Sequence, residues 1–158
     1  MSDPILIKHL YISPGHNFFG HHGLPPGEHE MIEVPEVRCL AGRGLEGDRF
    51  LDFKTDYKGQ VTFFAHEIYV ELCATLGVRD KAPSAFRRNV ITKGVELNTL
   101  IGREFEIQGV RFLGTAECSP CQWQDGAFAP GTEAALQGRG GLRAKILTDG
   151  VLRRDFEP

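Results

Sequence analysis

Two cysteines three positions apart, Cys118 and Cys121, are the residues of this chain best suited to chemistry. They follow residues 105–112, whose alternating apolar positions and Gln-Gly centre predict a β-hairpin, so a thiol is expected at a strand end. The pair could form a redox couple, hold half of a zinc site, or supply one thiolate to a soft or high-valent metal or to a persulfide. Without further context, two unremarkable thiols near the surface explain the spacing equally well.

The first two of these alternatives lack their usual surroundings. A thioredoxin-like redox pair needs a helix directly after the first cysteine, and we see no helical pattern there. A zinc site needs further ligands, which only His16, His21, His22 and His29 could provide, in a glycine- and proline-rich loop at about 14–30. These histidines lack the spacing of helical metal ligands. Zinc is therefore the weaker interpretation of the thiol pair, and we interpret the loop as an exposed segment that covers a pocket.

A glycine-rich loop at residues 42–49 offers backbone N–H groups and charged side chains to an anion. Residues 42–47 match the dinucleotide-binding pattern G-x-G-x-x-G, but no helical period follows, so we exclude a dinucleotide site. The remaining alternatives are a tight loop that exposes Asp48 and Arg49 beside a pocket, or a structural turn closed by an ion pair from Asp48 to Arg49 or from Glu46 to an arginine.

Other arginines lie beside glycines or a strand start. Residues 87–89, two arginines and an asparagine that include Arg88 and Asn89, precede a predicted strand, and Arg139 and Arg143 flank Gly140 and Gly141. Arginine forks match phosphate and carboxylate groups, and successive glycines can form an anion-binding backbone nest. Each group alone is more often solvated surface, but their recurrence in glycine-rich loops favours an anion site.

Short strands separated by glycines must position these residues, and one clear helix accompanies them. The helix is expected at residues 66–76, with Gly77 as its left-handed C-terminal residue. Strands are expected at 5–13, at 31–40 with an edge or bulge at Pro35, at 60–64, at 89–92, and in hairpins at 105–112 and 145–152. The pattern predicts one mostly β domain over residues 1–158, a curved or closed β-barrel with a few short helices. Trp123 and Phe128 fit either an aromatic wall for a flat ligand or ordinary core packing.

Composition excludes several classes of function. The chain has 158 residues, 41% of them hydrophobic, and a net charge of −3. This charge gives no reason to expect nucleic acid or a membrane surface as a partner. No apolar run approaches the length of a transmembrane helix, and the N-terminus lacks the layout of a signal peptide, so we expect a cytoplasmic protein. Cys39 and Cys73 are expected to be small buried hydrophobic residues rather than disulfide partners.

Taken in order, several motifs give the chain a resemblance to the MOSC domain, which is named for the C-terminal domain of molybdenum cofactor sulfurases. The resemblance runs from about residue 31 to the C-terminus and rests on residues 44–50, 61–63 with Glu67, 87–97, Gly102 and Gly109, 118–121, 138–141 and 149–150.

The resemblance implies a β-barrel fold of the MOSC type and a molybdenum cofactor of the molybdopterin type, or sulfur destined for it. The key cysteine of the family matches Cys121, and Cys118 takes a supporting role. By the same resemblance, the pterin phosphate or the molybdenum oxo groups would be held by Arg88, Asn89, Arg139, Gly140 and Gly141. The pocket would be shaped by Asp48 and Arg49.

These implications lead to two uses of Cys121. It would ligate molybdenum for the reduction of N-hydroxylated substrates, or it would carry a persulfide that delivers sulfur. The expected partners are an electron-donor protein or a sulfurtransferase, through which pyridoxal phosphate would be involved. Two alternatives stay open: a noncatalytic module that docks on a sulfurtransferase or cofactor-synthesis enzyme, and a structural zinc protein, which predicts unfolding on chelation.

Overall fold

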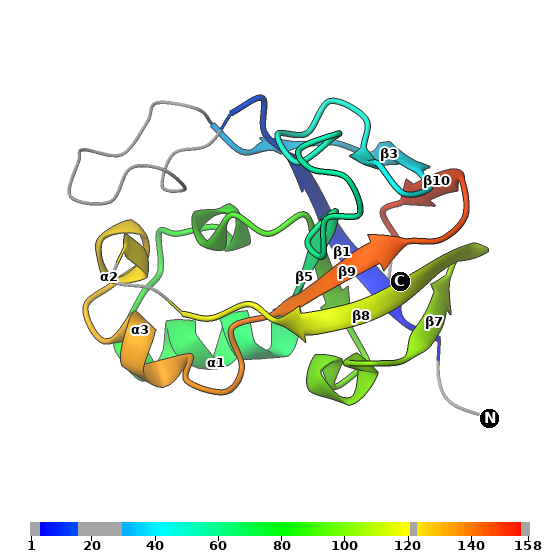
Figure 1. Cartoon of the computed structure of the whole chain (residues 1–158). Coiled ribbons are helices and arrows are strands. Elements are labelled where there is room, and N and C mark those ends of the chain that lie inside the picture. Colours follow the sequence, from blue (N-terminus) through cyan, green and yellow to red (C-terminus); the bar gives the residue numbers. More distant parts are fainter. Residues whose placement is uncertain (1–3, 16–29, 121–122, 156–158) are drawn as a thin grey trace.

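A computed structural model describes residues 4–15, 30–120 and 123–155 (Figure 1). Two sheets and a group of short helices make up the molecule. The seven-stranded sheet has the order β2-β1-β6-β5-β9-β8-β7, and the three-stranded sheet has the order β10-β3-β4. The elements are, in chain order, β1 Leu6–Ile12, β2 Ile32–Glu33, β3 Glu36–Leu40, β4 Gly44–Leu45, β5 Val61–Ala65, α1 His66–Leu76, η1 Pro83–Phe86, β6 Val90–Lys93, η2 Leu97–Leu100, β7 Glu104–Ile107, β8 Val110–Glu117, α2 Trp123–Ala127, α3 Thr132–Ala135, β9 Leu142–Ile146 and β10 Gly150–Arg153.

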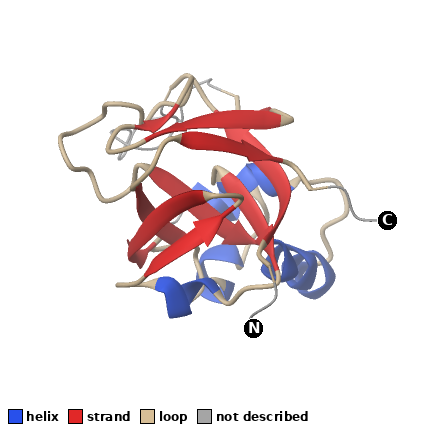
Figure 2. Cartoon of the chain, turned by 90° about the vertical axis from the view of Figure 1, so that its right-hand side faces the viewer, coloured by secondary structure: helices blue, strands red, loops and turns tan. Residues whose placement is uncertain are grey.

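The prediction of a mostly β protein with a few short helices is confirmed, but the alternative of a closed barrel is not seen. Within the described residues the seven-stranded sheet is open, because its end strands β2 and β7 each pair with one neighbour only. The strands curve around the interior, and the three-stranded sheet lies across one end (Figure 2). Among the strands that the structure describes, only β5 and β6 pair in parallel, and the connection between them contains α1 and η1.

Pro35 divides the strand predicted at residues 31–40. The part before it, β2, pairs with β1 in the large sheet, and the part after it, β3, pairs with β10 and β4 in the small sheet. Proline has no N–H to donate to a neighbouring strand, so the chain changes sheets at this residue. The bulge or edge expected at Pro35 is therefore a corner between the two sheets.

Of the two predicted hairpins, one is confirmed and the other is wrong. The turn between β7 and β8 has Gln108 at φ 52° and Gly109 at φ 84°, the left-handed conformations that a two-residue hairpin turn requires. The segment 145–152 does not fold back on itself, because β9 pairs with β5 and β8 whereas β10 pairs with β3. Asp149 accepts a hydrogen bond from the Ala41 backbone N–H at 2.7 Å, which directs the chain to the other sheet instead.

Strand β5 is buried on both faces and divides the hydrophobic core. Phe63 packs in a cluster between the two sheets, and Phe64 packs on the helix side. The predicted helix α1 is confirmed, with Leu72 buried against Phe64 in the helix-side cluster and Gly77 at φ 67° after its last turn. Among the described residues, no helix is long and apolar enough to span a membrane.

A glycine in β8 lets the chain that leads to Cys118 pass under η2. A Cβ at Gly114 would clash with the carbonyl oxygen of Leu100 and lie 2.8 Å from its carbonyl carbon. Gly114 also marks a shift in the register between β8 and β9. Both contacts are with backbone atoms, which cannot turn away as a side chain could.

We therefore predict that Gly114→Ala lowers the free energy of unfolding by about 2 kcal/mol or more, because η2 must shift to admit the methyl group. Urea denaturation followed by circular dichroism measures the loss. Gly126→Ala is the matched control, since a Cβ at this glycine of α2 meets no atom within 4 Å. Equal stability of the two variants would contradict the assigned contact.

Candidate functional site

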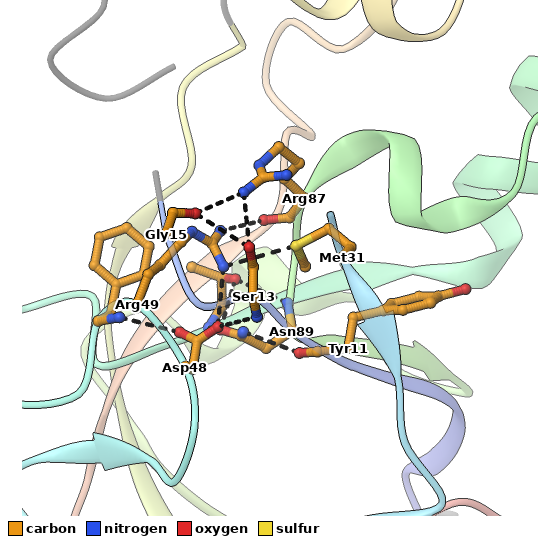
Figure 3. A network of polar contacts seen from close by, with 10 residues as sticks. Tyr11, Ser13, Gly15, Met31, Asp48, Arg49, Arg87 and Asn89 are labelled. Atoms are coloured by element: carbon orange, nitrogen blue, oxygen red, sulfur yellow. Dashed lines mark hydrogen bonds and ion pairs between the residues drawn. The ribbon is translucent and has the colours of Figure 1, made fainter. Parts of the chain in front are cut away.

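A buried carboxylate, Asp48, lies at the centre of a polar network between β1, the loop after β4 and the start of β6 (Figure 3). The side chain is fully buried and accepts hydrogen bonds from the backbone N–H groups of Ser13 at 3.0 Å and Phe50 at 3.2 Å. It also forms an ion pair with Arg49 at 3.0 Å. The ion pair inside the loop, foreseen as the structural alternative for residues 42–49, is therefore present, and the carboxylate is not exposed to a pocket.

Arg49 connects this carboxylate to the segment before β6. One guanidinium nitrogen, Nη2, donates to the carbonyl oxygen of Arg87 at 2.9 Å, and the guanidinium also lies 4.8 Å from the centre of the Phe50 ring. Burial lowers the pKa of Arg49, with a further lowering by Arg88 that Asp48 opposes. Arg49 and Arg88 are thus two positive charges that lie near each other, and the carboxylate of Asp48 pairs with Arg49.

Arg87 adds a third. It follows the short helix η1 in a left-handed conformation, φ 56°, which is strained for a residue with a side chain. Its Nη2 donates to Ser13 Oγ at 3.1 Å and to the Gly15 carbonyl oxygen at 2.9 Å. Burial, and then the charge of Arg49, lower the pKa of Arg87 to about 10. We call Arg49, Arg87 and Arg88 the arginine cluster; within these three residues and Asp48, three positive charges lie near one negative charge.

Asn89, expected to bind a cofactor, is fully buried and bonded within the protein. Its amide nitrogen donates to the Tyr11 carbonyl oxygen at 3.1 Å, and its side-chain oxygen accepts from the backbone and the hydroxyl of Thr62 at 3.0 and 3.1 Å. These bonds join β1, β5 and the start of β6. In the structure the Asn89 side chain therefore holds together the strands beside the arginine cluster.

Gly140 and Gly141 lie between Arg88 and Cys118. The Arg88 Nε donates to the Gly140 carbonyl oxygen at 3.4 Å, and the Cys118 N–H donates to the Gly141 carbonyl oxygen at 2.8 Å. A Cβ at Gly140 would clash with the carbonyl oxygen of Cys118, and one at Gly141 would lie 2.5 Å from that of Phe63. The glycines are needed for this close approach, and they bring the first thiol of the pair next to the arginine cluster.

Arg139, by contrast, turns toward the helices. It forms an ion pair with Glu71 of α1, and its Nε donates to the carbonyl oxygen of Ala135 at 2.9 Å. Of the three arginines and one asparagine expected at one anion site, the structure brings Arg49 and Arg88 together near Asn89, whereas Arg139 pairs with Glu71. Ser13 was not expected, and Arg87, the first of the two arginines before the strand, was given no role in the site; neither carries a spacing signal, because their contacts are long-range.

The thiols have different surroundings. Cys118 is 2% exposed and follows β8 directly, as the predicted hairpin required. Cys121 and the four histidines of the 14–30 loop lie outside the described residues, so their predicted roles stay predictions. A short helix, α2, does follow the pair, contrary to expectation; its five residues were too few to give a period. Phe128 packs in the helix-side core, which favours the core interpretation of this ring.

The remaining cysteines and the metal hypothesis can be compared directly with the structure. Cys39 is fully buried, as predicted, and burial raises its pKa to about 12. Cys73 is only half-buried, against the helix-side core. In the described part of the chain no group of three His, Cys, Asp or Glu side chains could hold a metal ion.

The comparisons with known proteins agree with this geometry. The family model described as "MOSC domain" matches residues 28–155. The chain belongs to the MOSC domain family. This match includes every described residue of the arginine cluster, the glycine pair and Cys118. No curated protein sequence matches the chain.

Solved structures with the MOSC-like fold resemble the chain at low sequence identity. The YuaD protein of Bacillus subtilis superimposes with a TM-score of 0.74 at 17% identity, covering 94% of this chain and 91% of YuaD. YiiM of Geobacillus stearothermophilus gives 0.67 at 15% identity, covering 95% and 71%. YiiM of Escherichia coli gives 0.62 at 18% identity, covering 91% and 65%. At these identities the likeness establishes the shared fold.

The buried pair of Asp48 and Arg49 predicts a large loss of stability when its charge is removed. Asp48→Asn leaves the Arg49 guanidinium buried without its counterion, and we expect a loss of about 3 kcal/mol in the free energy of unfolding, measured by urea denaturation. Glu46→Gln is the control on the same loop. Its pair with Arg38 spans 3.6 Å between largely exposed side chains, so the loss should stay below about 0.5 kcal/mol. Similar losses in both variants would contradict the central role of Asp48.

Burial also predicts which thiols resist alkylation. At about pH 9, the ordinary pKa of a thiol, Cys39 stays protonated in the folded protein because burial raises its pKa to about 12. In the unfolded chain the Cys39 thiol ionises near pH 9. The contribution of this thiol to the free energy of unfolding is therefore full below about pH 9 and falls as the pH rises above it. Iodoacetamide labelling of the folded protein, read by peptide mass spectrometry, should spare Cys39 and Cys118 and modify both in urea. Rapid labelling of Cys39 without denaturant would refute this.

Proposed function

We propose that this MOSC protein binds a molybdenum cofactor of the molybdopterin type, with its phosphate at the arginine cluster and with Cys121 as the thiolate ligand of molybdenum. The observation that carries the proposal is the gathering of three guanidinium groups, Arg49, Arg87 and Arg88, next to the segment that contains the two thiols. A chain with a net charge of −3 has no general attraction for anions, so an anion would have to be attracted by local groups such as these.

The donor chemistry of the arginine cluster fits a phosphate group. Guanidinium forks bind phosphate oxygens through paired N–H groups, and a phosphate would bring negative charge to the place where three guanidinium groups lie near one carboxylate. Arg88 is the best placed of the three for direct contact, since no carboxylate among the described residues forms an ion pair with it and its one hydrogen bond, through Nε, is long at 3.4 Å. Arg49 and Arg87 are more deeply bound to Asp48 and Ser13 and would act from behind it.

The two thiols would have different roles. Cys118 is buried and tied to Gly141 through its backbone, so its role would be to position the segment that leads to Cys121. The thiolate of Cys121 would be a soft sulfur donor, which suits molybdenum as a ligand. When bound, the cofactor would supply a two-electron centre, and the reaction we propose is the reduction of N-hydroxylated compounds with electrons from a partner protein. The chain itself would bind and neutralise the anion and present the thiol.

A persulfide carrier is the alternative that needs the same thiol. A persulfide anion on Cys121 would also be stabilised by neighbouring positive charge, and a sulfurtransferase would be the partner in place of an electron donor. This alternative predicts transferable sulfur and no bound molybdenum.

Metal analysis tests the proposal. The protein is purified from a host that makes molybdenum cofactor, and its molybdenum is measured by mass spectrometry in the wild type, Cys121→Ser, Arg88→Gln and Cys118→Ala. We expect molybdenum in the wild type, its loss in Cys121→Ser, a decrease of about tenfold in Arg88→Gln because one charge-assisted contact is removed, and a mild effect in Cys118→Ala.

Arg111→Gln is the matched control, because this arginine is exposed on β8 and pairs with Glu104 at 3.1 Å. Molybdenum that persists in Cys121→Ser would defeat the ligand assignment. A wild-type protein without molybdenum whose intact mass includes an extra sulfur atom would establish the carrier, and zinc in every variant would revive the structural metal site.

A further inference from the structure

A pocket lies beside the glycine pair, and none of the three arginines of the cluster lines it. It has a volume of ≈ 510 Å³ and is formed by the first turn of α1, the segment between β6 and η2, and the loop before β9. In Figure 1 these three segments lie together below the large sheet. The volume is in the range of about 300–1,000 Å³ that small-molecule sites occupy, so the pocket can hold a small organic ligand.

One side of the pocket is aliphatic. Ala65 and Leu97 are buried, and Ile68 and Val95 pack against the core between the sheets. These four side chains come from different elements, the end of β5, α1 and the segment 94–98, and they leave a continuous apolar wall. Such a wall favours a ligand with an apolar body, because apolar surface on both partners leaves water on binding.

The charge of the pocket is negative. Glu67 and Glu96 line it, and neither forms an ion pair within the described residues. Glu67 accepts a hydrogen bond from the Gly94 N–H at 2.9 Å, a neutral donor that leaves the carboxylate charge in place. Arg139, the cationic side chain in the lining, is neutralised by Glu71.

A third carboxylate lies behind the lining. Glu117 accepts a hydrogen bond from the Asn98 side-chain nitrogen at 3.1 Å, and the same nitrogen donates to the Gly138 carbonyl oxygen at 2.7 Å. Asn98 is neutral, so the charge of Glu117 also remains. Lys93 precedes Gly94 in the chain but is not among the lining residues. The fixed charges of the pocket therefore complement a cation.

We infer that this pocket binds a small organic cation with an apolar body, such as an amine or an amidine, whose positive group lies toward Glu67 and Glu96 and whose apolar part lies against Ile68, Val95 and Leu97. The inference goes beyond the proposed function, since it concerns another site with the opposite charge. The two sites share only the loop 138–141, whose Gly141 carbonyl oxygen binds the Cys118 N–H.

Nuclear magnetic resonance of the full ¹⁵N-labelled chain tests the inference with three probes of similar body: benzylammonium, benzyl alcohol and benzoate. Benzylammonium should shift the amide signals of residues 94–98 and 138, and benzyl alcohol and benzoate should bind at least about fivefold more weakly. Glu67→Gln and Glu96→Gln should each weaken benzylammonium binding about fivefold, because each removes one exposed charge.

Two controls keep the result interpretable. A glutamine at position 67 can still accept the Gly94 N–H, so the fold should persist, and thermal unfolding verifies this. Glu106→Gln, on the exposed side of β7, should leave binding unchanged. The inference is overturned if benzyl alcohol or benzoate binds as well as benzylammonium, if neither glutamine variant weakens binding, or if the pocket amides do not shift. None of these readouts depends on molybdenum, so the proposed function can fail or succeed separately.

Discussion

The carboxylate of Asp48 is the group on which the candidate site depends. Its oxygens bind two backbone N–H groups and Arg49, and Arg49 in turn binds the carbonyl oxygen of Arg87. A buried arginine is costly without a counterion, and a second and third one nearby add repulsion. The Asp48 carboxylate therefore helps to make three guanidinium groups tolerable in a small volume. A gathering of guanidinium groups is the property that an anion site needs, and the surrounding strands hold it in place.

The elements that local patterns determine could be predicted from the sequence. The apolar period and Gly77 gave α1 with its observed bounds, and Gln108 with Gly109 gave the hairpin of β7 and β8. Asp149 and Gly150 predicted a turn but not the strand that β10 pairs with, because a turn signal indicates only that the chain changes direction. The pairing of β10 with β3 depends on a contact from Asp149 to Ala41, which are far apart in the sequence. Sheet closure is long-range in the same way.

For the site, residue types predicted the chemistry better than the geometry. Arg49, Arg88 and the glycine pair do come together. The Asn89 side chain instead bonds to neighbouring strands, and Arg139 forms an ion pair with Glu71. No local sequence pattern states which group either arginine will contact, so the sequence alone does not separate the role of Arg88 from that of Arg139. What separates them is the presence of a carboxylate on α1, one helical turn from Glu67, that faces Arg139. Ser13 and Arg87 could be recognised only once β1 and β6 were seen side by side.

The contact of Gly140 and Gly141 with Cys118 has a consequence for how such proteins can diversify. The first thiol of the pair is located by main-chain atoms, which requires glycine at positions 140 and 141 but no particular side chain at positions 138 and 139. Gly138, where a Cβ meets no atom within 4 Å, and Arg139 border the pocket beside the glycine pair. New side chains that suit the left-handed backbone at 138, or any at 139, can thus alter what this pocket accepts while the thiol stays where it is. One short loop separates a part of the molecule that must stay constant from a part that is free to vary.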